Sequence, residues 1–65
     1  MTRTIEQNAR ELEIARMRMD QARDLLADAI IAGQANTDRL EMVHAAAIAD
    51  YKDLMAEARY MMRAA

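Results

Sequence analysis

The chain has 65 residues, a net charge of −2 at pH 7 and no cysteine. A chain of this length forms one small domain at most, and it buries too little apolar surface to be stable without a staple such as a disulfide, a metal or a second chain. The missing cysteines exclude a disulfide and a cysteine-based zinc site, and the single histidine excludes a multi-histidine metal site within one chain. Oligomerisation is therefore the expected source of stability.

The composition favours helix over strand. The sequence has no proline and one glycine, and its two tyrosines are its only aromatic residues. Alanine, arginine, glutamate, leucine and methionine are good helix formers, whereas strands need β-branched and aromatic residues. No apolar run approaches the roughly 20 residues of a membrane span, and the first residues lack the apolar core of a signal peptide. We therefore expect a cytoplasmic protein with no membrane partner.

Helix start and stop signals divide the chain, residues 1–65, into two helices. Thr4 and Gln7 form a capping box, which predicts a first helix over about residues 5–32. Gly33 is expected to end this helix in the left-handed conformation.

Residues 33–36 then read as a short connection, and Thr37 or Asn36 caps a second helix that runs over about residues 37–62. Two helices of similar length joined by a short loop predict an all-α fold, an antiparallel helix–turn–helix hairpin in a single domain.

Apolar and small residues repeat every seven positions in both predicted helices, which places each row on one side of its helix. The first helix has a large row, Ile5, Leu12, Met19 and Leu26, beside a small row, Asn8, Ala15, Ala22 and Ala29. The second helix has the rows Leu40, Ala47, Leu54, Met61 and His44, Tyr51, Ala58, Ala65, widened by Ile48, Met55 and Met62. Small residues let two helix backbones approach closely while the large ones fill the space alongside.

Two facing helices leave part of these stripes open, including Leu25 and Ile30, and pairing two hairpins into a homodimeric four-helix bundle would cover them. The predicted core and dimer seam consists of Ile5, Leu12, Ala15, Met19, Ala22, Leu26, Ala29, Leu40, His44, Ala47, Ile48, Tyr51, Leu54, Ala58 and Met61.

Glu41 and His44 form a Glu-x-x-His pair, as found in di-iron helix bundles. Such a site also needs facing glutamates, but the acids expected opposite, Asp24 and Asp28, lie on the outer side of their helix. We therefore predict no metal site and interpret His44 as a seam residue.

Four arginines, Arg10, Arg16, Arg18 and Arg23, suggest a phosphate-binding stripe on the first helix. Interleaved acids favour a solvated, salt-bridged face instead, with pairs such as Glu6–Arg10 and Arg16–Asp20. The absence of a nearby aromatic residue to stack on a base also argues against nucleic-acid binding.

Several apolar residues fall outside the seam. Alanine on an outer face can reflect helix propensity alone, but a face with few charges is also typical of an interface. The candidate partner-binding residues are Ile14, Met17, Met42, Ala45, Ala49, Ala56 and Tyr60.

No catalytic function is predicted, because the chain lacks serine and cysteine and has no glycine-rich phosphate loop. No cofactor is expected either. The first hypothesis is a dimeric protein that binds and regulates or inhibits another protein, similar in size and architecture to phage-encoded inhibitors of host transcription regulators or defence complexes. One alternative is an RNA-binding or other nucleic-acid-binding bundle, because the predicted topology resembles that of the plasmid RNA-binding Rop protein. Another is a structural coiled-coil subunit of a larger assembly.

Overall fold

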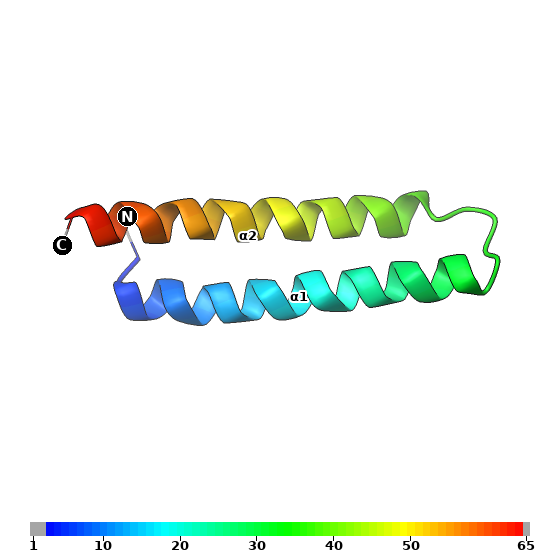
Figure 1. Cartoon of the computed structure of the whole chain (residues 1–65), viewed down its shortest axis with the longest axis horizontal. Helices are drawn as coiled ribbons and strands as arrows, with labels where there is room; N and C mark the ends of the chain where they lie inside the picture. Colours follow the sequence, from blue (N-terminus) through cyan, green and yellow to red (C-terminus); the bar gives the residue numbers. More distant parts are fainter. Residues whose placement is uncertain (1–2, 65) are drawn as a thin grey trace.

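The computed structural model describes residues 3–64 and consists of two antiparallel helices, α1 (Ile5–Ile31) and α2 (Asp38–Ala64), which pack side by side along their whole length (Figure 1). The hairpin measures 49 × 17 × 15 Å. Within residues 3–64 there is no strand, so the predicted all-α hairpin is confirmed. Neither of the two helices is long and apolar enough to cross a membrane.

The predicted capping box starts α1. The Thr4 side-chain oxygen accepts a hydrogen bond from the Gln7 N–H at 3.1 Å, and the Gln7 side-chain oxygen accepts one from the Thr4 N–H at 3.0 Å. Two of the N–H groups at the helix end, which have no partner within the helix, are thereby satisfied.

Gly33 ends α1 as expected, with a φ of +74°. Ala32 is the C-cap, so α1 ends at Ile31, one residue before the predicted end of the helix. The Gln34 N–H donates to the Ala29 carbonyl at 2.9 Å and the Gly33 N–H donates to the Ile30 carbonyl at 3.0 Å. These two bonds form a Schellman motif, in which the residue after the C-cap is left-handed and therefore favours glycine.

The start of α2 depends on Asn36. Its side-chain oxygen accepts a hydrogen bond from the Asp38 N–H at 3.0 Å, while its carbonyl accepts one from the Gln34 side chain at 2.8 Å. The Thr37 carbonyl accepts the N–H of Glu41 at 2.9 Å and so begins the helical hydrogen-bond ladder. Both residues proposed as caps thus take part, and the side-chain cap is Asn36.

The helices meet along the small row of α1. Asn8, Ala15, Ala22 and Ala29 are the buried residues of that helix, and α2 has none that is buried to the same extent. Asn8 is 3% exposed. Small side chains at the contact let the two backbones approach closely.

The large row of α1 lies beside this contact. Leu12, Met19 and Leu26 are half-buried, whereas Ile5 is 64% exposed. An α-helix turns about 20° per heptad relative to a strict seven-residue repeat, so the row moves steadily away from the contact towards the N-terminus. Ile5, the member nearest the N-terminus, was predicted to lie in the seam, but it is outside the core of the single hairpin.

Candidate functional site

The hairpin has two flanks, one on each side of the line where the helices meet. Residues four positions after a member of the small row turn about 40° to one side of that line, and residues three positions after turn about 60° to the other. The first set is Leu12, Met19 and Leu26, and the second is Glu11, Arg18 and Leu25. The two flanks therefore differ in chemistry.

The flank that carries Glu11 and Arg18 is charged and holds a groove of about 540 Å³ between the helices. Ala15, Ala47 and Leu54 line it together with Ile14. Its charged lining residues are Arg3, Glu11, Arg18, Asp50, Asp53 and Glu57. We call this side the charged flank.

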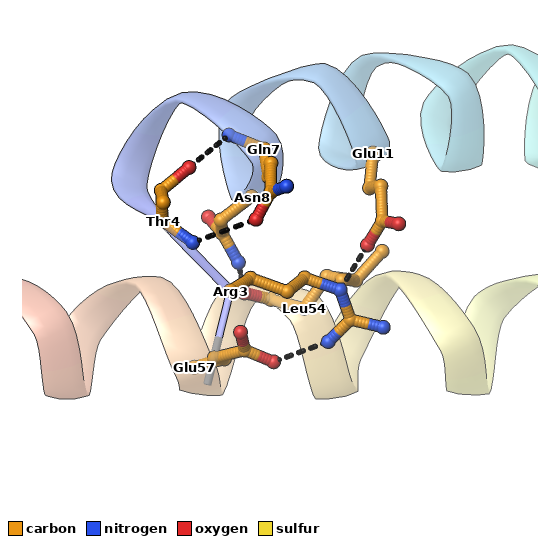
Figure 2. A network of polar contacts seen from close by, with 7 residues as sticks. All are labelled: Arg3, Thr4, Gln7, Asn8, Glu11, Leu54 and Glu57. Atoms are coloured by element: carbon orange, nitrogen blue, oxygen red, sulfur yellow. Dashed lines mark hydrogen bonds and ion pairs between the residues drawn. The ribbon is translucent and has the colours of Figure 1, made fainter. Parts of the chain in front are cut away.

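A polar network closes one end of the charged flank (Figure 2). An Arg3 guanidinium nitrogen, Nη1, donates to Glu57 Oε2 at 2.7 Å, and Arg3 Nε is paired with Glu11. The second carboxylate oxygen of Glu57, Oε1, is buried and accepts no hydrogen bond. Because these side chains keep contact with solvent, the ion pairs contribute about 1 kcal/mol or less.

Asn8 belongs to the same region and joins the two helices directly. Its side-chain nitrogen Nδ2 donates to the backbone carbonyl of Leu54 at 3.2 Å (Figure 2). Sequence reasoning placed Asn8 in the small row but gave it no role. A polar residue among alanines was the available signal, since a single buried asparagine commonly fixes the register of packed helices.

The opposite flank is apolar. Leu12 and Tyr51 border a small hollow there, and Glu13 and Arg16 line its charged edge. Ile48 and Met55 stand three residues before and four residues after Tyr51, so they share its side of α2. We call this surface the apolar flank, and its half-buried members are Leu12, Met19, Leu26, Ile48, Tyr51 and Met55.

The outer face of α2 points away from α1. Met42 and Tyr60 on this face are 72% and 70% exposed. The alanines between them, Ala45, Ala49 and Ala56, are exposed as well. By helical spacing, Lys52 and Asp53 border this face on its two sides, and Asp53 also lines the groove of the charged flank.

The predicted partner-binding residues do not form one surface. Ile14 lines the groove of the charged flank instead of lying on the outer side of α1 with Met17. Met17 is exposed on the outer face of α1. Because the two helices pack against each other, the outer face of α1 and the outer face of α2 lie on opposite sides of the hairpin. The five candidates on α2 are brought together, whereas Ile14 and Met17 are separated from them.

The predicted seam residues differ in depth. Ala15, Ala22 and Ala29 are buried and Ile5 is exposed. The half-buried members are Leu12, Met19, Leu26, Leu40, His44, Ala47, Ile48, Tyr51, Leu54, Ala58 and Met61. Ala65, the last member of its row, lies outside the described residues.

The charges of α1 pair differently from the prediction. Arg23 lies 3.8 Å from Asp20 and 3.6 Å from Asp24. The expected pairs Glu6–Arg10 and Arg16–Asp20 are not among the ion pairs of residues 3–64, where Asp20 lies beside Arg23 instead. Exposed pairs of this kind gain little from a fixed geometry. No group of three His, Asp or Glu side chains in the described part of the chain could hold a metal ion.

Comparison with known proteins finds no match: no protein-family model, no curated protein and no solved structure is significantly similar to this chain.

Proposed function

We propose that this chain is a small non-enzymatic helical protein that binds another protein and regulates or inhibits it through the outer face of α2. The observation that carries the proposal is the chemistry of that face. Met42 and Tyr60 are exposed at its two ends, alanines lie between them, and the nearest charges, Lys52 and Asp53, stand at its borders. A phage-encoded inhibitor of a host regulator or defence complex is one form that such a protein would take.

These side chains suit a protein partner. Exposed methionine adapts its shape to the surface it meets, and tyrosine supplies a large, amphipathic contact for little loss of conformational entropy. The alanines let a partner helix approach the backbone of α2. Met42 and Tyr60 lie about 27 Å apart along the helix axis, the length of the contact when a helix binds along a groove or face.

The proposal includes the pairing of two hairpins into a homodimeric four-helix bundle. Its support is that the described part of a single hairpin fully buries no large side chain, although 54% of the sequence is hydrophobic. A domain of this size needs more buried apolar surface than that to offset its loss of conformational entropy.

Two of the four arginines of α1 stand beside acidic side chains, which favours a protein partner over RNA. Arg18 lines the groove beside acidic side chains, and Arg23 is held by Asp20 and Asp24. A phosphate backbone binds instead to a run of free positive charges.

Affinity capture with the tagged full chain tests the proposal. The wild type and the control Gln21→Glu, which adds the same charge at an exposed position of α1, are expected to retain the same protein. Met42→Glu should retain it at least about 10-fold more weakly, with unchanged helix content by circular dichroism. Equal retention by Met42→Glu, or retention of RNA with a steep salt dependence instead of a protein, would contradict the proposal.

A further inference from the structure

We propose that a second copy of this chain covers the apolar flank, and that association stops at two copies because the other flank is charged. The inference rests on the proposed function for the homodimer and adds which surface forms it and why it is closed. The large row of α1 is then the dimer contact, whereas the small row is the contact within each hairpin.

The exposed area of the hairpin supports such a cover. The chain exposes 5492 Å². A compact monomer of its mass, 7.4 kDa, exposes about 4,200 Å². If each of two copies buried only the excess, the interface would cover roughly 2,600 Å² in total, which lies in the range of obligate homodimers.

The apolar flank is long enough to bury this area. Its half-buried residues on α1 are Leu12, Met19 and Leu26. Ile5 continues this row at the N-terminal end, and Ile30, which is 60% exposed, continues the stripe near the loop. The stripe from Ile5 to Ile30 is about 38 Å long. It runs beside Ile48, Tyr51 and Met55 of α2, so both helices contribute. Residues at its margin, such as Arg16, can cover apolar surface with their stems and keep their charge in water.

The difference between the flanks limits the assembly. A surface that pairs with its own copy around a two-fold axis is consumed in that pairing. Further stacking would have to bury the charged flank, where Asp50, Asp53 and Glu57 stand beside Arg18 around the groove. Burying charges without matched partners is costly, so the dimer is closed.

Two adjacent isoleucines provide a matched test. Ile30 lies on the apolar flank, whereas Ile31 is 84% exposed and by helical spacing points away from α2. The masses of the wild type, Ile30→Glu and Ile31→Glu are measured by light scattering and sedimentation equilibrium at micromolar concentration. The wild type and Ile31→Glu should have about twice the chain mass of 7.4 kDa, and Ile30→Glu should dimerise at least about 100-fold more weakly.

A second pair covers the middle of the flank. Leu26→Glu should also weaken dimerisation, whereas Leu25→Glu on the charged flank should not. Helix content is followed by circular dichroism on dilution. Ile30 is exposed in the single hairpin, so its replacement by glutamate should not unfold one chain directly. If Ile30→Glu loses helix as it dissociates and Ile31→Glu does not, the loss follows from the lost dimer and also supports the inference.

Three results would overturn the inference: a wild-type monomer at micromolar concentration, a mass that keeps rising above two chains, or loss of the dimer in Ile31→Glu and Leu25→Glu instead of their neighbours. All three are measured on the purified chain without a partner. A failure of the proposed partner binding at Met42 would leave these masses unchanged, so the two failures are distinguishable.

Discussion

Ala22→Leu is expected to destabilise the hairpin, although leucine forms helices almost as well as alanine. Ala22 lies in the small row and is 5% exposed, so three added carbon atoms cannot reach solvent and must push α2 away. Overpacking of this kind costs about 1–3 kcal/mol. In a domain of this size each kcal/mol lowers the melting temperature by roughly 4–8 °C.

Thermal unfolding followed by circular dichroism measures the effect. All variants are compared at one chain concentration, because dissociation and unfolding of a dimer are coupled. Ala46→Leu, at an exposed position of α2, is the control and should change stability by no more than about 0.5 kcal/mol. An unchanged or higher melting temperature for Ala22→Leu would refute the close contact along the small row, because leucine would then fill space instead of overfilling it.

Three further changes test the contacts that hold the hairpin. Gly33→Ala should lower the free energy of unfolding in urea by about 1 kcal/mol, since the space around Gly33 is open and only its φ of +74° opposes a side chain. Gly33→Asn should lower it less, because asparagine tolerates this φ better, and an equal loss would contradict this cause. Asn8→Ala should cost about 1 kcal/mol by the same assay through the lost hydrogen bond to Leu54, and no loss would show that this bond does not contribute. Arg3→Gln should cost about 1 kcal/mol or less at low ionic strength, and the difference from wild type should vanish in concentrated salt; a difference that persists there would mean that the Arg3–Glu57 contact is not mainly electrostatic.

Local signals predicted the ends of the helices well. The capping box of Thr4 and Gln7 and the left-handed Gly33 each depend on a few neighbouring residues, so their chemistry can be read directly from the sequence. The heptad rows predicted two packed helices for the same reason. The start of α2 was predicted less sharply, because Asn36 and Thr37 are both good caps and the geometry of the loop decides between them.

The depth of each row could not be predicted from its spacing. Both rows of α1 repeat every seven residues, yet the small row makes the contact and Ile5 is left exposed. The slow rotation of a straight helix against a seven-residue repeat decides this, together with the register of the two helices. The Arg3–Glu57 contact joins residues 54 positions apart, so it too depends on that register.

The candidate surfaces were predicted as residues but not as surfaces. Met42 and Tyr60 were singled out as apolar residues outside the seam, and both lie on the outer face of α2. Met17 was singled out for the same reason, but the antiparallel packing turns it to the opposite side of the hairpin. Which helix faces combine is a property of the packing, and no local pattern contains it.

The most direct test of the division between a self-association surface and a partner surface uses the methionine methyl groups of the wild-type chain. Methyl-labelled and unlabelled chains are mixed, and nuclear Overhauser contacts between copies are recorded by isotope filtering. We expect contacts between copies at Met19 and Met55 on the apolar flank, whereas Met17 and Met42 should lack such contacts and should be broadened by a soluble paramagnetic agent. Contacts between copies at Met17 or Met42, with Met19 and Met55 exposed to the agent, would contradict this expectation.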